Sequence, residues 1–242
     1  MNASRTARER ARAELTREIK DEARRQLAVD GAGRLSLRAV ARELGLVSSA
    51  LYRYFPTRDD LLTALIIDAY DALGAAAEAA DAARPRDDPR GRWRAVAAAV
   101  RDWALAHPHE YALIYGSPVP GYQAPQDTVA PAARVALAIV GVVRDAWSAG
   151  ALEARPSPAL SPVLAEQTAK LAELIAPDLP GEVLTRLLIV WTQVFGMLSF
   201  ELFGQLVGSV DPSDEFYAHA VERMADFVGL PPDGPDSTKG PA

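Results

Sequence analysis

The sequence predicts an all-α protein, and the pattern of apolar and helix-breaking residues supports that fold class. Apolar residues recur at intervals of three and four along most of the chain, which is the spacing of one helix face. The first such stripe consists of Leu15, Ile19, Ala23 and Leu27. Segments rich in Pro and Gly, such as 85–91 and 116–125, interrupt the pattern, and no segment shows sustained β-alternation. We therefore expect helices joined by loops.

Capping residues and breakers set the expected bounds of each helix. Ser36 is a plausible cap for the second helix, Ser48 or Ser49 opens the third, and Thr57 with two acidic residues behind it starts the fourth. The expected helical ranges are 11–29, the two short helices that follow Ser36 and Ser48, 57–83, about 92–107, 110–115, 128–152, 164–176, 182–207 and 213–228. The tail 231–242 lacks the residues for a core, and we expect it to be disordered.

Composition indicates a soluble globular protein. Hydrophobic residues make up 49% of the 242 positions and charged residues 24%, and the absence of cysteine excludes disulfides and thiolate metal sites. The first twenty residues alternate charges and do not resemble a signal peptide. The most apolar stretch, 187–200, contains Thr192 and Gln193 and is shorter than a membrane span. We expect a cytoplasmic protein.

The net charge is divided unevenly along the chain. The formal charge is -6, yet residues 1–60 hold 13 basic against 9 acidic side chains, and the remainder holds 13 against 23. Binding to phosphates depends on the local basic surface, so a basic N-terminal part in front of an acidic body is compatible with nucleic-acid binding.

The most informative segment is 35–58, LSLRAVARELGLVSSALYRYFPTR, which has the spacing of a helix-turn-helix. Its apolar positions can bury two short helices against each other, and Gly45 lies where the tight turn belongs. These apolar positions are Val40, Leu44, Leu46, Leu51 and Tyr54, with the small Ala41 where the backbones approach. The second helix of such a motif enters the major groove of DNA.

This segment resembles the TetR-type transcriptional regulators. The resemblance lies in the run L-S-x-R-x-V-A-x-E-L-G of 35–45, in L-Y-R-Y-F of 51–55 and in the opening of the next helix at 56–62. Tyr54 stands where the family usually has His, and Arg58 where it usually has Lys. Both replacements can still donate a hydrogen bond to a phosphate.

The resemblance implies roles for two groups of residues in the motif. Those expected at base edges are Arg38, Ser48, Ser49, Ala50 and Arg53. Those expected to hold phosphates are Ser36, Tyr52, Tyr54, Thr57 and Arg58. The DNA-binding domain would then span 1–56, and a helical domain for effector binding and dimerisation would span 57–230.

The helix expected at 182–207 is apolar on nearly every side, so it needs partners on several faces. The helical body can cover one face, and a two-fold related copy is the natural cover for another. The resemblance likewise implies pairing through the two late helices, and we expect Phe195 and Leu198 in the dimer seam or in the core beneath it. Trp191 and Gly196 are also similar to a W-x-x-x-H-G signature of one C-terminal subfamily, with Phe195 in place of its His.

Aromatic residues spread over the body suggest a cavity for a lipophilic or aromatic effector, although each of them alone could equally fill the core. The expected lining is Trp103, Tyr111, Tyr115, Trp147, Trp191, Gln193 and Phe195, and Arg101 could add a polar group. By the resemblance, an effector would tilt the helix beginning at Thr57, change the separation of the two recognition helices and release a palindromic operator.

Other classes of function fit the residues less well. His107 and His109 have no further ligands at metal-binding spacing, and no metal or cofactor is expected. An enzyme would need a nucleophile with a base, a metal set or a phosphate-binding glycine loop, and none of these patterns is present. A helical adaptor that uses the hairpin for protein contact is the remaining alternative. Unlike a DNA-binding protein, it would not show steep salt dependence on duplex DNA.

Overall fold

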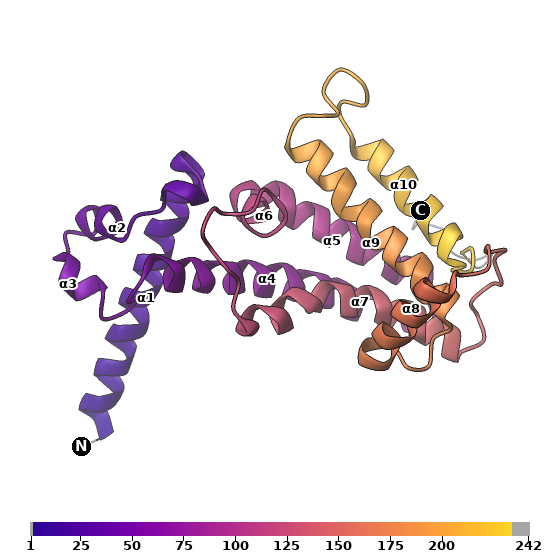
Figure 1. Cartoon of the computed structure of the whole chain (residues 1–242), viewed down its shortest axis with the longest axis horizontal. Coiled ribbons are helices and arrows are strands. Elements are labelled where there is room, and N and C mark those ends of the chain that lie inside the picture. The colour runs from indigo at the N-terminus through magenta and orange to yellow at the C-terminus, as the bar shows by residue number, and fades with distance from the viewer. Residues whose placement is uncertain (1, 234–242) are drawn as a thin grey trace, which may run out of the picture. The chain divides into compact units, whose positions relative to one another are not determined.

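The computed structural model describes residues 2–233, which form helices with no strand among them (Figure 1). The all-α fold is therefore confirmed over this range. Two short 3-10 turns, η1 (Ala32–Arg34) and η2 (Gln126–Thr128), lie between the α-helices. The α-helices are α1 (Asn2–Asp30), α2 (Leu37–Glu43), α3 (Ser48–Leu51), α4 (Arg58–Ala82), α5 (Pro89–Ala106), α6 (Pro108–Tyr115), α7 (Val129–Ser148), α8 (Pro162–Ile175), α9 (Gly181–Leu202) and α10 (Asp214–Val228).

Three helix bounds differ from the expectation by more than three residues. The first helix starts at Asn2 instead of residue 11, because 2–10 contains no Gly or Pro and is rich in Arg, Ala and Glu, which favour helix. α7 and α9 end before residues 152 and 207, where we expected them to end. Gly150 and Gly204 follow these helices with φ of 67° and 79°, and a residue in this left-handed conformation ends a right-handed helix.

The chain divides into two compact units. Unit 1 consists of Met1–Asp71 and His107–Pro131, and unit 2 consists of Ala72–Ala106 and Ala132–Ala242. Each unit combines segments that are distant in the sequence. α6 and the segment behind it thus belong to the unit that holds the helix-turn-helix. The functional boundary that we expected at residue 57 remains a prediction.

Unit 1 has one core, built around α1, α2, α3 and the first half of α4. The predicted stripe of α1 supplies Ile19, Ala23 and Leu27, all of which are buried. Their partners from the other helices are Leu37, Val40, Ala41, Leu51, Phe55, Leu61, Leu62, Leu65 and Ile66. Leu113, Ile114 and Tyr122 pack against this core from α6 and the segment that follows it.

The core of unit 2 is formed by the amphipathic faces of α5, α7, α9 and α10. The buried side chains include Trp93, Val100, Val143, Val194, Leu198 and Val221. The indole nitrogen of Trp93 donates to the carbonyl of Val221 at 3.0 Å, and the hydroxyl of Tyr217 donates to the carbonyl of Ala97 at 2.9 Å. Both buried polar atoms of this α5–α10 contact are therefore satisfied.

By length and composition, α9 could cross a membrane, and it is the one helix of residues 2–233 for which this is so. Its inward face lies in the core of unit 2, where Val190, Val194 and Leu198 are buried. This arrangement is also that of a core helix in a helical bundle.

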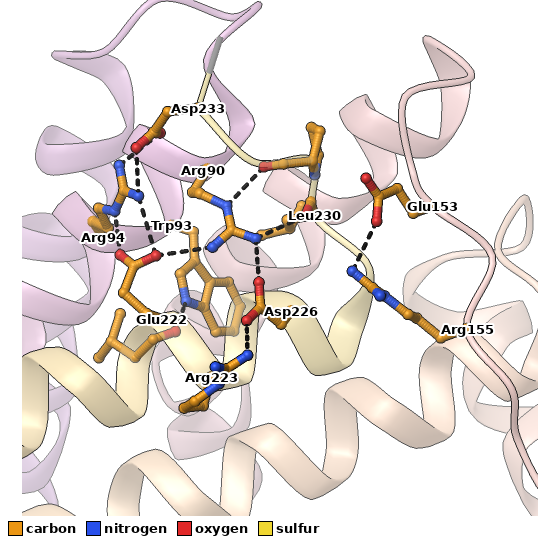
Figure 2. A network of polar contacts seen from close by, with 12 residues as sticks. Arg90, Trp93, Arg94, Glu153, Arg155, Glu222, Arg223, Asp226, Leu230 and Asp233 are labelled. Atoms are coloured by element: carbon orange, nitrogen blue, oxygen red, sulfur yellow. Dashed lines mark hydrogen bonds and ion pairs between the residues drawn. The ribbon is translucent and has the colours of Figure 1, made fainter. Parts of the chain in front are cut away.

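A cluster of ion pairs holds the end of the described chain against α5 (Figure 2). We call this cluster, made of Arg90, Arg94, Glu222, Asp226 and Asp233, the arginine clamp. Arg90 pairs with Glu222 at 2.8 Å and with Asp226 at 2.7 Å, and Arg94 pairs with Glu222 and, at 2.8 Å, with Asp233.

The clamp also bears on the tail that we expected to be disordered from residue 231. Arg90 donates to the carbonyl oxygens of Leu230 at 2.9 Å and Pro231 at 2.7 Å, so residues 231–233 are held in place by the clamp. The expected disorder of the tail, which considered only the inability of these residues to form a core, stays a prediction. Residues 234–242 lie outside the described part of the chain.

The clamp shifts the titration of its acidic members. Hydrogen bonds from Arg94 and Arg90 hold the pKa of Glu222 below its ordinary value, and the hydrogen bond from Arg90 does the same for Asp226. Carboxylates with depressed pKa values stabilise the fold above their unfolded-state pKa, and this contribution is lost as the pH falls through the folded-state pKa.

We predict that Arg90→Ala destabilises the protein by about 1–3 kcal/mol, because Arg90 is only 7% exposed and its removal leaves the carbonyls of Leu230 and Pro231 without that donor. Glu222 and Asp226 lose one partner each but keep Arg94 and Arg223. The matched control is Arg223→Ala, which removes an arginine that contacts the same Asp226 but is 63% exposed, and it should cost less than about 1 kcal/mol. Urea unfolding of both variants measures the difference. The deficit of Arg90→Ala should shrink below about pH 4, where the carboxylates protonate; equal losses in the two variants would contradict this account.

Candidate nucleic-acid interface and ligand site

The helix-turn-helix forms as the sequence indicates. Ser36 caps α2, and its hydroxyl accepts a hydrogen bond from the backbone N–H of Ala39 at 3.4 Å. Gly45 turns the chain with φ of 65°, a conformation that suits glycine, and the N–H of Leu46 then bonds to the carbonyl of Ala41 at 2.8 Å. Leu51 is fully buried and attaches α3 to the core of unit 1.

The residues expected at base edges lie on the open side of this motif. Arg38, Ser49 and Arg53 are exposed, while Ser48 and Ala50 are half-buried. Among the residues that the structure describes, neither Arg38 nor Arg53 has a hydrogen-bond or ion-pair partner, so their guanidinium donors are available to an external acceptor.

The residues expected at phosphates fall into two groups. Tyr52 is 41% exposed and open to a ligand, but Thr57 is engaged within the chain, where its N–H and hydroxyl donate to Asp60 at 2.9 and 2.7 Å. Tyr54 is half-buried, and the guanidinium of Arg12 lies 5.4 Å above its ring. Ser36 uses its hydroxyl as the cap of α2.

Arg58 has an internal role that the sequence pattern did not reveal. Its guanidinium donates to the backbone carbonyls of Ala32 at 2.7 Å, Leu35 at 3.2 Å and Gly33 at 3.3 Å. These bonds tie the first turn of α4 to the link between α1 and α2. A phosphate contact by Arg58 would require some of them to open, and the expected phosphate role remains a prediction.

Val47 is a candidate contact residue that the sequence analysis missed. It precedes α3 directly, as the N-cap residue, and is 70% exposed. An apolar side chain at the start of a recognition helix can pack on the methyl group of thymine in the major groove. The available signal was that Val47 has no place in the apolar spacing of the motif, since Leu46 and Leu51 already supply the core contacts.

An ion-pair network joins α1 to α4 and α6, next to the helix-turn-helix. Asp68 of α4 accepts from Lys20 at 2.7 Å and from Arg24 at 2.6 Å, both on α1. Arg24 also reaches Glu110 of α6 at 3.2 Å. The hydroxyls of Thr63 and Tyr122 share a hydrogen bond of 2.9 Å, so the segment behind α6 is bonded to α4 as well.

Three tyrosines form a cluster within unit 1, and two of them were expected at a ligand cavity. The rings of Tyr111 and Tyr115 are 5.2 Å apart, and Tyr70 meets Tyr115 edge to face at 6.0 Å. Tyr111 is fully buried. Burial also raises the pKa of the Tyr115 hydroxyl above its ordinary value.

The expected ligand residues of unit 2 are divided between core and surface. Trp191 and Phe195 lie one helical turn apart on α9 with ring centres 4.4 Å apart, and Phe195 and Trp103 are buried. Trp147 is 41% exposed near the end of α7, and Gln193 is exposed on α9.

Arg101, which we considered as a polar group for the cavity, is engaged elsewhere. It pairs with Glu201 at 2.6 Å and with Asp214 at 3.0 Å, and so joins α5 to the ends of α9 and α10. Within residues 2–233, no three His, Cys, Asp or Glu side chains are grouped so that they could hold a metal ion.

Comparison with known proteins gives two family matches. Residues 19–65 match the family described as bacterial regulatory proteins, tetR family, and residues 93–224 match the tetracyclin repressor-like C-terminal domain. The chain is 42% identical over 215 residues to the HTH-type transcriptional regulator Rv1816 of Mycobacterium tuberculosis, with 81% of this chain and 83% of the relative covered. The regulator Mb1846 of Mycobacterium bovis matches to the same extent.

Solved structures agree with these matches. The regulatory protein SCO4313 superposes with a TM-score of 0.72 at 36% identity over 90% of this chain and 98% of its own. A Rhodococcus sp. RHA1 protein of unknown function gives 0.68 at 28% identity, over 90% and 96% of the two chains.

The helix-turn-helix, the fold and the relatives confirm the resemblance on which the residue roles were based. The subfamily signature with Phe195 in place of His remains a prediction. The relatives are transcriptional regulators, as expected for a chain without catalytic motifs. The chain belongs to the TetR family of DNA-binding transcriptional regulators, which carry a ligand-binding C-terminal domain.

Proposed function

We propose that this regulator is a cytoplasmic, homodimeric repressor that leaves a palindromic operator when a lipophilic or aromatic effector occupies its C-terminal domain. The observation that carries the proposal is the open face of the helix-turn-helix, where Arg38, Val47, Ser49 and Arg53 are exposed around a buried Leu51. Side chains held in this way can read base edges without rearrangement of the core.

Substitution of Arg38 and substitution of Arg58 should affect DNA binding in different ways. Arg38→Ala should relax sequence preference and cost about 1–3 kcal/mol of operator binding if the contact is bidentate to guanine. Arg58→Ala should weaken operator and random duplexes alike, because it releases the carbonyl bonds that position α4 and removes a cation near phosphates. Titration of both duplexes at several salt concentrations measures the two effects. If both variants bind both duplexes as the parent does, the roles proposed for Arg38 and Arg58 are wrong.

A second copy of the chain is the natural partner of the outer faces of α9 and α10. TetR regulators form dimers, and each of these helices has a row of exposed residues at helical spacing that includes aromatic side chains. On α9, Ile189 is 45% exposed and Phe200 is 56% exposed, with the small Gly196 between them. On α10, Phe216 is 40% exposed and Phe227 is 43% exposed.

For Phe195 and Leu198, the sequence left open whether they lie in the seam or in the core beneath it. Leu198 is fully buried and Phe195 is 7% exposed within a single chain, so both belong to the core beneath the seam. The sequence could not separate seam from core because nearly every side of α9 is apolar.

Phe200→Asp should produce a folded monomer, because it places a charge in the desolvated seam without entering the core. Leu198→Asp should unfold the protein, because it buries an unpaired charge within one chain. The control is Val29→Asp, which changes an 82% exposed apolar residue at the end of α1 and should leave the dimer intact. Sedimentation together with circular dichroism distinguishes the three outcomes. A folded dimer of Phe200→Asp would place the seam elsewhere.

The effector should contact the aromatic pair Trp191 and Phe195 in unit 2, which is an apolar surface with few polar groups. A ligand that binds only the folded state stabilises it by about 2.7 kcal/mol at one hundred times its Kd. A thermal-shift panel of hydrophobic compounds should therefore yield at least one that raises the Tm.

Trp191→Ala should abolish that shift, whereas Trp147→Ala should retain it, because Trp147 is 41% exposed and lies outside the core. If no compound shifts the parent, or if both variants respond like the parent, the effector part of the proposal is wrong while the DNA-binding part stands.

A further inference from the structure

The N-terminal turns of α1 extend beyond the part of the helix that packs into unit 1. The first fully buried residue of α1 is Ile19, and Leu15 is partly buried, whereas residues 6–14 are all exposed. Figure 1 shows this end of α1 projecting from the helices around it. The projection is a regular helix, so the direction of each side chain follows from its register.

The core-facing stripe of α1 continues into this projection with a different chemistry. Arg8 and Arg12 precede Leu15 and Ile19 at spacings of four, three and four residues, which places all four on one face of the helix. The apolar stripe that packs against the core of unit 1 thus becomes a basic stripe where the core ends.

Arg12 connects this stripe to the recognition segment. Its guanidinium lies 5.4 Å above the ring of Tyr54, in the segment between α3 and α4. Arg8 lies one helical turn further out and has no hydrogen-bond or ion-pair partner among the described residues. The two arginines therefore extend the surface on which the recognition helix already lies.

We infer that Arg8 and Arg12 form a second DNA contact, binding backbone phosphates beside the groove that α3 enters. Two features favour DNA as the partner. The stripe is continuous with the face of the helix-turn-helix, and its charge is complementary to the phosphates. Arginine also binds phosphate oxygens bidentately, and such contacts fix the position of a protein on the duplex without reading its sequence. This inference rests on DNA binding through the helix-turn-helix.

The same helix supplies a matched control. Arg10 and Arg17 are seven residues apart, so they share a face, and the helical register places that face roughly opposite to the one with Arg8 and Arg12. Both are exposed and neither has a partner among the described residues. The pairs Arg8→Ala/Arg12→Ala and Arg10→Ala/Arg17→Ala therefore remove the same charge from one helix but from opposite sides.

The experiment measures the salt dependence of binding to the operator and to random duplex for the full chain and the two double variants. The affinity falls as salt rises, so the slope of log K against log salt is negative. Loss of two phosphate contacts should make this slope less steep by about 1.8 per copy of the chain. Between about 50 and 200 mM salt, the parent should then lose about twelve times more affinity per copy than Arg8→Ala/Arg12→Ala. The ratio of operator to random binding should stay at the parent value, and the control pair should keep the parent slope.

Arg8→Ala alone should produce about half of the change in slope, and because it leaves the contact of Arg12 with Tyr54 intact, it tests the stripe without disturbing the recognition segment. Circular dichroism and sedimentation establish that each variant remains folded. Equal slopes for the two double variants would overturn the inference, and a fall in the operator-to-random ratio would place the arginines on bases instead of phosphates. If the parent itself shows no salt-dependent binding, the DNA-binding role fails before the stripe is tested.

Discussion

The recognition helix α3 is a single turn, Ser48–Leu51, and a helix of that length has no stability of its own. Its shape and direction depend on Leu51, which is fully buried among α1, α2 and α4 residues of the unit 1 core. Gly45 permits the tight turn in front of it, and the buried Phe55 fixes the chain behind it. The exposed face of α3 can therefore carry polar and small residues that contribute nothing to the core, because its position is set from the other side.

Polar contacts then fix the elements around that core. Arg58 holds the start of α4 to the link between α1 and α2. Asp68, ten residues further along α4, pairs with Lys20 and Arg24 of α1. Arg24 extends the network to Glu110 of α6. Because α4 contributes residues to both units, a displacement of this helix would act on the helix-turn-helix through bonds at both its first turn and its middle.

Unit 2 follows a different principle, in which buried arginines join the helices. Arg92 is fully buried and pairs with Asp81 at 2.6 Å and Asp145 at 2.8 Å, linking the ends of α4, α5 and α7. Arg90 binds α10 and the residues behind it in the clamp. Such pairs require nearly complete satisfaction of their donors and therefore favour one arrangement of the helices over others.

The sequence by itself determined the all-α class, the position of the helix-turn-helix, the cap at Ser36 and the turn at Gly45, because each is encoded by neighbouring residues through spacing and backbone conformation. It also indicated which side of α3 faces outward, since the apolar positions of a short helix leave only one open face. What it could not determine depended on contacts between distant segments. Three features have no local signature. They are the bonds of Arg58 to carbonyls more than twenty residues away, the ion pairs of Arg101 with Glu201 and Asp214, and the exposure of Trp147. Only the tertiary structure decided them, because the partner of a long polar side chain, or the cover of an aromatic ring, is chosen by which helices pack together.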